Sequence, residues 1–374
     1  MKLLRIVLAV ALYLVASIGV IYLGPAQARP PQNERISVFE SRVARQGRLV
    51  LSGSANVGLV RALIVDYQRV HPAVEVRYSH LDTKDIYRRT VNATAAQERA
   101  DLLLSSSTDL QIKLVNDGFA QAYRSPQSQA LPAASRWRDE VFAYGYEPVV
   151  MVYNTTRLQP RRVPQTRDQL RKLLLEPDNP LRGRIGLQDP RDSAVAYFIA
   201  TQETKLLGSD AGPMLTALGE NRAQLFRRMD GLLDQLSSGE MSFAYGVFGS
   251  YALQRIERGA SLGIVLPRDH LLLVARTALI PRDAPNTAEA QRFLDHMLSA
   301  RGQAILASEA KLIPARTDLP ASASAQVYGG FDPRSDALRR TPLGLGFLVY
   351  LDEVKRRRFL EHWREYLTPT ATAP

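Results

Sequence analysis

The clearest pattern in the sequence is a short apolar run, a small polar loop and a helical repeat, in that order. Residues 49–51 (LVL) predict a buried strand, and residues 52–56 (SGSAN) predict a sharp turn. The apolar positions that follow Gly58 recur at helical spacing, with Ser54 as a candidate N-cap. Such a unit leaves N–H donors and a positive helix end at the strand's carboxyl end, where open α/β sheets bind ligands, anions in particular.

The same unit recurs further along the chain. Residues 100–104 predict a strand that runs into Ser105-Ser106-Ser107, and Thr108 opens the next helix. Residues 183–187 predict another strand, followed by Asp189, Arg191 and Ser193 before a helix that begins at Ala194. A strand over 241–244 is predicted to end at Tyr245-Gly246, with a helix over 247–258. This alternation indicates an α/β fold.

Two long extended segments and several helices complete the pattern. Residues 142–154 and 262–278 are rich in β-branched, aromatic and apolar side chains, which favour strands. Helices are predicted over 85–97, 226–236, 286–300 and 349–366. The 286–300 helix carries a capping-box pattern, in which Asn286 is the N-cap and Glu289 reaches back to it.

The N-terminus has the features of an export signal. Lys2 and Arg5 precede an almost unbroken apolar run over 6–23, and residues 26–28 (AQA) form a cleavage site. We therefore expect residues 1–28 to be a cleaved signal peptide, which places the mature protein in the periplasm, and residues 29–47 to be a spacer. The alternative is an uncleaved membrane anchor, because 18 apolar residues just span a bilayer.

Length and composition narrow the function further. The 374 residues suffice for about two domains, and the formal net charge of +11 falls to +9 without the signal. Most basic residues are arginines scattered singly, with no Lys/Arg-rich block beyond residues 355–358 (KRRR), which argues against nucleic acid binding. The chain has no Cys, its five His show no metal-ligand spacing, and the common catalytic motifs are absent from the sequence. We expect neither an enzyme nor a bound cofactor or metal.

The order of segments resembles a known family. An export signal, the strand–loop–helix start, VVMVYN, FAYGVFGSYAL, LGIVLPRDHLLLVARTALI and AEAQRFLDHMLSARGQAILA follow one another. This succession is similar to ABC-transporter periplasmic solute-binding proteins of the type 2 fold, in the branch of ferric-iron-binding and phosphoglycerate-transport regulatory proteins. The resemblance implies two α/β lobes, formed by 48–145 with 268–374 and by 146–267. It also implies two extended crossover hinges and closure of the lobes on a ligand.

One departure from the family pattern concerns iron. The iron-binding members use two adjacent tyrosines after the strand that corresponds to 241–244, and here that position holds Tyr245-Gly246. The next tyrosine is Tyr251, and the chain contains no Tyr-Tyr pair. A hard ferric ion needs several anionic oxygen ligands together, so the departure argues against iron as the ligand.

The candidate ligand-binding residues lie in the loops named above. They are Ser52, Ser54, Ala55, Ser106, Ser107, Asp189, Arg191, Ser193, Tyr245 and Gly246. Hydroxyl groups, backbone N–H groups and Arg191 suit a carboxylate or a phosphate. Each serine is alternatively only a helix cap, Arg191 a solvated surface residue, Asp189 a structural carboxylate and Tyr245 a filler of the hinge core.

The sequence thus predicts a periplasmic solute-binding component of an ABC importer that captures a small anionic solute and delivers it to a membrane permease. We expect it to act as a monomer. One alternative is a ferric-iron carrier. Another is a ligand-binding subunit that signals to a membrane sensor histidine kinase.

Overall fold

The computed structural model describes residues 35–94, 98–319, 328–329, 331–332 and 335–369. The predicted signal peptide lies outside the described residues. The predicted spacer is described from Arg35, and there it forms a strand, β1 (Arg35–Phe39), which pairs antiparallel with β3 (Val74–His80). Within the described residues, no helix combines the length and the apolar character needed to cross a membrane.

The other helices and strands alternate along the chain, as the apolar pattern predicts. The remaining strands are β2 (Gly47–Gly53), β4 (Leu102–Ser105), β5 (Arg136–Trp137), β6 (Val141–Asn154), β7 (Ile185–Gln188), β8 (Gln224–Phe226), β9 (Phe243–Phe248), β10 (Leu262–Val265), β11 (Leu271–Leu279) and β12 (Leu338–Arg340). The α-helices are α2 (Gly58–Val70), α3 (Thr83–Val91), α4 (Thr108–Asn116), α5 (Arg167–Leu175), α6 (Ala194–Leu207), α7 (Ala211–Glu220), α8 (Met229–Ser238), α9 (Gly249–Glu257), α10 (Thr287–Leu298), α11 (Ala300–Ser308) and α13 (Glu353–Leu367). Short 3₁₀ turns include η5 (Leu345–Leu351).

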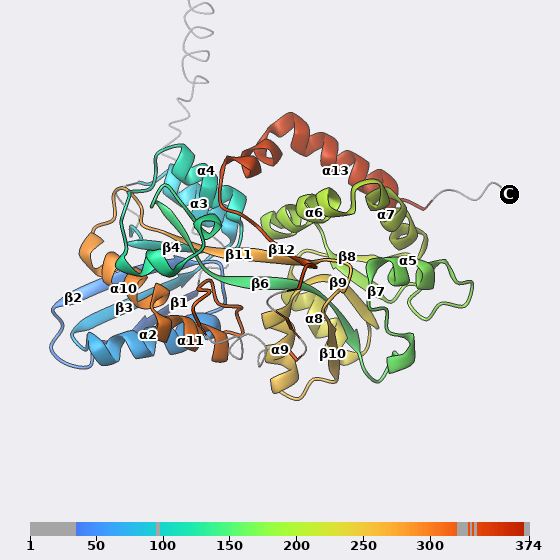
Figure 1. Ribbon diagram of the computed structural model, residues 1–374, viewed down its shortest axis with the longest axis horizontal. Coiled ribbons are helices and arrows are strands. Elements are labelled where there is room, and N and C mark those ends of the chain that lie inside the picture. The colour runs from blue at the N-terminus through green and yellow to red at the C-terminus, as the bar shows by residue number, and fades with distance from the viewer. Residues whose placement is uncertain (1–34, 95–97, 320–327, 330, 333–334, 370–374) are drawn as a thin grey trace, which may run out of the picture. The chain divides into compact units, whose positions relative to one another are not determined.

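One strand, β6, joins two groups of strands. Its first residues, up to Pro148, pair with β11, whereas Val149–Tyr153 pair with β9 and Met151–Asn154 pair with β10. The strand order is β1-β3-β2-β4-β11-β6-β9-β7-β8. We call β1–β4 with their helices the first half and β7–β9 with their helices the second half (Figure 1). β6 and β11 occupy the predicted crossover segments, and the lobe boundaries at 145/146 and 267/268 stay predictions.

Helices cover both faces of the first half. α2, α10 and α11 pack on one face, and α3 and α4 lie on the other (Figure 1). β2 therefore has its apolar residues buried on both sides, as the run at 49–51 predicts. Both β3 and β4 run parallel to β2, so the carboxyl ends of all three strands meet at one edge of the sheet.

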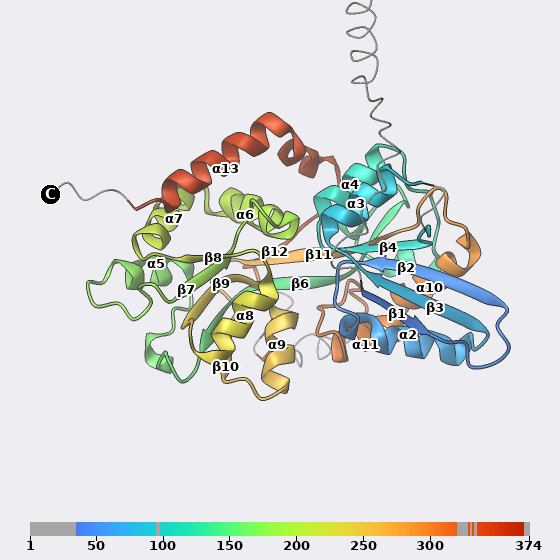
Figure 2. The same cartoon turned by 180° about the vertical axis from the view of Figure 1, so that it is seen from behind.

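The second half has the same layered arrangement. α6 and α7 cover one face, α8 and α9 cover the other, and β8 and β9 both run parallel to β7 (Figure 2). The sequence-based division placed residues 268–374 with the first lobe. In the structure, the C-terminal α13 packs against α7 of the second half. The close approach depends on Gly219, where a side-chain carbon would lie 2.3 Å from the Leu367 carbonyl oxygen. Trp363 of α13 is buried in the second-half core.

Several element boundaries differ from the sequence-based expectation. α2 has Val57 at its N-cap position without a side-chain cap, so Ser54 is not its cap. The capping box at Asn286 does not form, because this residue donates both its backbone N–H and its amide to Asp101. Glu289 instead accepts from the Tyr67 hydroxyl at 2.9 Å. These competing tertiary partners outweigh the local pattern.

A buried polar cluster anchors α5 to α6 in the second half. Arg167 donates two hydrogen bonds to the Glu203 carboxylate, both at 2.7 Å. Its other partners are Asp269, at 3.1 Å, and the His270 carbonyl oxygen, at 2.7 Å. Burial opposes ionisation of Glu203, but the charges and hydrogen bonds of Arg167 and His270 outweigh it and lower the pKa of Glu203 to about 2. Arg167 and Glu203 therefore form a buried ion pair with several further hydrogen bonds.

This cluster predicts a defined loss of stability in acid. The pKa of Glu203 in the folded chain, about 2, lies below its ordinary value of 4.5, so its contribution to stability is complete above pH 4.5 and is lost as the pH falls towards 2. Glu203→Gln leaves Arg167 incompletely compensated and should cost about 3–5 kcal/mol at pH 7. Urea unfolding between pH 7 and pH 3 measures both effects.

Glu176→Gln is the matched control, because Glu176 is exposed and pairs with Arg162 at 2.6 Å on the surface. Loss of this surface ion pair should lower the free energy of unfolding by less than about 1 kcal/mol. If Glu203→Gln and the wild-type chain lost stability in parallel below pH 4.5, the assignment of this acid sensitivity to Glu203 would be wrong.

Candidate functional site

Two sheet edges carry the polar loops of the molecule. In the first half, β2, β3 and β4 end at Gly53, His80 and Ser105, and each is followed by a loop and a helix N-terminus. In the second half, β7, β8 and β9 end in the same way before α6, α8 and α9. Carboxyl ends of parallel strands are where open α/β sheets bind ligands, and the helix ends there favour negative charge.

Ser54 and Ser106 meet at the first-half edge. The Ser106 N–H donates to the Ser54 hydroxyl at 3.2 Å, and the two hydroxyl oxygens are 3.4 Å apart. The Ser54 N–H is held by the Leu104 carbonyl oxygen at 2.9 Å. Ser54 is half-buried and Ser106 is buried, so their hydroxyl groups are held in a protected position. The structure brings together the two serines that the repeated strand–loop–helix pattern singled out.

The other predicted residues of this edge have structural partners. The Ala55 carbonyl oxygen accepts from the Tyr78 hydroxyl at 2.5 Å. The Ser107 hydroxyl donates to Asp109 at 2.7 Å and makes no cap hydrogen bond to α4. Ser52 lies within β2 and lines a different pocket, together with Ile86 and Leu103 among others.

At the second-half edge, the predicted residues form hydrogen bonds within their own segment. These residues are Asp189, Arg191 and Ser193. The Arg191 guanidinium donates to both oxygens of Asp189, with a shortest distance of 2.5 Å. Burial opposes ionisation of Asp189, but the hydrogen bonds from Arg191 outweigh it and hold its pKa below the ordinary value. Ser193 caps α6 by accepting from the Ala196 N–H at 3.1 Å. Asp189 and Arg191 therefore form a closed local pair.

A hydrogen bond joins the two edges. Lys84, in the first turn of α3, donates from Nζ to the Asp192 carbonyl oxygen at 3.1 Å. Lys84 belongs to the first half, and Asp192 follows β7 in the second half. The loops after β3 and β7 thus lie within hydrogen-bond reach of each other. The pair formed by Ser54 and Ser106 belongs to the same first-half edge as the loop after β3.

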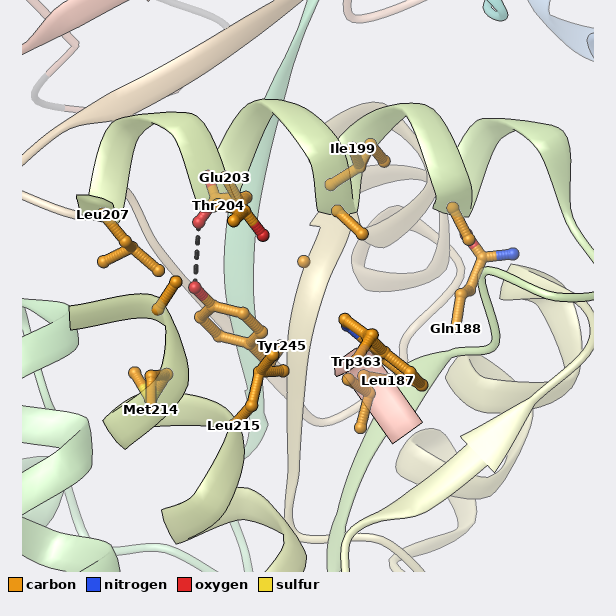
Figure 3. A pocket seen from close by; sticks show the side chains of 14 residues that line it. Leu187, Gln188, Ile199, Glu203, Thr204, Leu207, Met214, Leu215, Tyr245 and Trp363 are labelled. Carbon is orange, nitrogen blue, oxygen red and sulfur yellow. Dashed lines mark hydrogen bonds between the residues drawn. The ribbon is translucent and has the colours of Figure 1, made fainter. Parts of the chain in front are cut away.

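Tyr245 and Gly246 occupy a different place from the one predicted. β9 continues to Phe248, so both residues lie inside the strand and not in a loop after it. The Tyr245 hydroxyl donates to Glu203 at 2.8 Å and accepts from Arg167 at 3.1 Å. Both residues line a cavity of about 60 Å³ inside the second half, closed by Trp363 (Figure 3). Burial and the Glu203 charge raise the pKa of Tyr245 well above its ordinary value, so its phenol stays protonated.

Sequence reasoning missed two groups near the edges. His80 ends β3, and burial together with the charge of Arg228 lowers its pKa, which keeps it neutral at neutral pH. Arg276 lies in β11 and forms a buried ion pair with Glu147 of β6. The signal for Arg276 was present, because it is the single charge in the apolar run LLLVARTAL. Among the described residues, no cluster of three His, Asp or Glu side chains has the geometry to hold a metal ion.

Comparisons with known proteins identify the family. Residues 97–329, more than half of the chain, match the family described as bacterial extracellular solute-binding protein. The substrate-binding protein of an ABC transporter from Agrobacterium tumefaciens is 30% identical, with a TM-score of 0.81 over 90% of this chain and 100% of that one. The comparison with curated protein sequences finds no match.

More distant structures share the fold. AfuA from Actinobacillus pleuropneumoniae, with fructose-6-phosphate bound, is 20% identical, with a TM-score of 0.65 over 86% of this chain and 99% of that one. Iron-bound HitA from Pseudomonas aeruginosa is 18% identical, with a TM-score of 0.64 over 85% and 99%. The predicted family and fold class are therefore confirmed. The chain belongs to the bacterial extracellular solute-binding protein family, with the two-lobe α/β fold of periplasmic binding proteins.

Proposed function

We propose that this protein is the solute-binding component of an ABC importer, and that it captures a small anionic, phosphate- or carboxylate-bearing solute between its two halves. Export by residues 1–28 would deliver it to the periplasm, where it would act as a monomer and hand the solute to a membrane permease. Membership of the family supports the general role. The site residues support the choice of an anion.

The observation that carries the proposal is the serine pair at the first-half edge. Ser54 and Ser106 hold two hydroxyl groups and one N–H group within 3.4 Å of one another. Hydroxyl groups that bond to each other can turn to donate to an incoming oxyanion, and hydrogen bonds to charged groups are the stronger kind. The N-terminus of α4 begins beside them and adds its positive dipole end.

The charge of the surrounding residues is consistent with an anion. Arg228 lies near enough to His80 for its charge to lower the pKa of that imidazole. Asp189, the carboxylate of the opposite edge, is neutralised by Arg191. A bound phosphate ester is also present in AfuA, a protein of the same fold. An oxyanion would therefore meet donors and a nearby cation, and no unpaired carboxylate from the residues described above.

The first test is calorimetry of the chain from residue 29 onward with inorganic phosphate, 3-phosphoglycerate, succinate, citrate, spermidine and ferric citrate. We expect one or more of the four oxyanions to bind. Ser54→Ala and Ser106→Ala should each weaken that binding by about 10- to 100-fold, because each removes a hydrogen bond to a charged group. Ser237→Ala is the control, since this serine donates only within α8, to the Leu233 carbonyl oxygen at 2.7 Å.

Binding of spermidine alone would contradict the anionic class. Binding of iron without an oxyanion partner would favour the ferric-carrier alternative. If oxyanions bound equally well to the wild-type chain and to both serine variants, the solute site would have to lie elsewhere.

The contact between the two edges gives a kinetic prediction. If the halves close on the solute, the Lys84–Asp192 hydrogen bond forms only in the closed state and slows release. Lys84→Ala should then raise the dissociation rate by about 2- to 10-fold, the value of one ordinary hydrogen bond, with little change in the association rate. Stopped-flow measurements with the oxyanion found above provide both rates.

Lys172→Ala is the matched control, because Lys172 pairs with Asp168 within α5 at 2.7 Å. An unchanged dissociation rate in Lys84→Ala would show that the Lys84 contact has no part in holding the solute.

A further inference from the structure

An ion pair is buried where the two halves join. Arg276 of β11 and Glu147 of β6 are 1% and 0% exposed. Arg276 Nε donates to Glu147 Oε1 at 2.7 Å, and Nη2 lies 2.6 Å from the same oxygen. The Ser250 hydroxyl, in the first turn of α9, also donates to this oxygen at 2.6 Å. The Nε–Nη2 edge of the guanidinium is therefore held by the Glu147 carboxylate, and Ser250 of the second half fixes that carboxylate in turn.

The other edge of the guanidinium forms no hydrogen bond of good geometry, and we call it the free edge. The hydroxyl groups of Tyr144 and Tyr251 nevertheless lie close enough to interact with the guanidinium. Nη1 is buried and has no hydrogen bond of good geometry. Nη2 is close to the Glu147 oxygen, but its N–H groups do not point along a hydrogen bond. A guanidinium carries five N–H donors in a rigid fork, and buried donors without acceptors are costly and uncommon. The fork formed by Nη1 and Nη2 matches the spacing of two oxygens of a carboxylate or a phosphate. The neutral phenols of Tyr144 and Tyr251 compensate this buried charge less well than a carboxylate or a phosphate would.

Aromatic rings surround this free edge. The Arg276 guanidinium lies 5.7 Å from the Phe248 ring and 5.8 Å from the Tyr251 ring. Burial raises the pKa values of Tyr144 and Tyr251, and the nearby charge of Arg276 opposes that rise. Both phenols stay neutral, and their oxygens face the Arg276 guanidinium as weak acceptors.

Arg276 lies close to the first-half edge along β11, because the next residue, Thr277, pairs with Ser105 at the end of β4. The Arg276 charge acts on Tyr78 as well, and the Tyr78 hydroxyl donates to the Ala55 carbonyl oxygen at 2.5 Å. Phe248 ends β9, so its ring comes from the carboxyl edge of the second half. Arg276 thus has neighbours from both polar edges.

We propose that Arg276 determines the ligand class of the cleft by binding one oxyanion, a carboxylate or a phosphate, through its free Nη1–Nη2 edge, while Glu147 and Ser250 hold the guanidinium in position. This assignment rests on the proposed solute-binding function and deepens it. Arg276 is covered in the present arrangement, so an anion reaches it when the halves separate. A cationic solute would face repulsion from this edge and leave the fork unpaired.

The test uses the double variant Glu147→Gln/Arg276→Gln of the chain from residue 29 onward. It removes both charges together, which avoids leaving Glu147 as an uncompensated buried charge, and Glu147→Gln keeps the shape of that side chain. Calorimetry would use inorganic phosphate, 3-phosphoglycerate, succinate and citrate, with dimethyl succinate as the uncharged analogue and spermidine as the cation. We expect the wild-type chain to bind at least one oxyanion, and the double variant to bind it at least about 100-fold more weakly.

Two further variants keep the test decisive. Arg276→Lys retains the charge opposite Glu147 but removes the planar fork, so it should lose about tenfold in affinity even if the double variant fails to fold. Arg61→Gln is the control, because Arg61 stacks on the Phe39 ring at 5.1 Å, away from the polar edges. Thermal unfolding of each variant without solute shows whether it is folded.

The outcomes separate this inference from the proposed function. Oxyanion binding that is equal in the wild-type chain, Arg276→Lys and the double variant would overturn the role of Arg276 and leave the anion-binding function standing. If the wild-type chain bound only spermidine or dimethyl succinate, or none of the probes, both proposals would be wrong.

Discussion

The arrangement of this protein depends on β6, which belongs to two groups of strands at once. Because β6 exchanges β11 for β9 at Pro148 and Val149, the two groups share one backbone. The parallel strands of each group then run so that their carboxyl ends carry loops and helix N-termini. The hydrogen bond from Lys84 to Asp192 shows that these two edges come together. One continuous strand thereby brings helix ends from two separate parts of the chain to one place.

Two buried arginines show how the same side chain serves structure or remains available for a ligand. Arg167 has partners on all sides: Glu203, Asp269, the His270 carbonyl oxygen and Tyr245. Arg276 is equally buried, but its one charged partner is Glu147, on the edge that includes Nε, and its other neighbours are neutral phenols. Removing two charges from water is costly, and the cost is offset only when the remaining donors find acceptors. Arg167 meets that condition with carboxylates and a carbonyl group, whereas Arg276 meets it less completely.

The sequence predicted the parts of the site that depend on local pattern. The apolar runs at 49–51 and 102–104 read as fully buried strands, so the serines that follow them had to share an edge. The predicted position of Tyr245 and Gly246 after the strand is wrong, because the strand was expected to end at Ala244 and β9 continues to Phe248. Arg276 was not among the predicted residues, because nothing local says whether a lone Arg in an apolar strand finds a carboxylate. That answer depends on Glu147, 129 residues away.

The buried tyrosines bear on the choice between an oxyanion and a ferric ion as the solute. Iron held by phenol oxygens requires those phenols to lose their protons. Burial raises the pKa of Tyr245, and Glu203 accepts its proton in a hydrogen bond, so ionising it would place two negative charges together. Tyr251, the next candidate, is also buried with a raised pKa, and Arg276 only partly offsets that rise. Neutral phenols beside a guanidinium are donors, and donors are what a carboxylate or a phosphate requires.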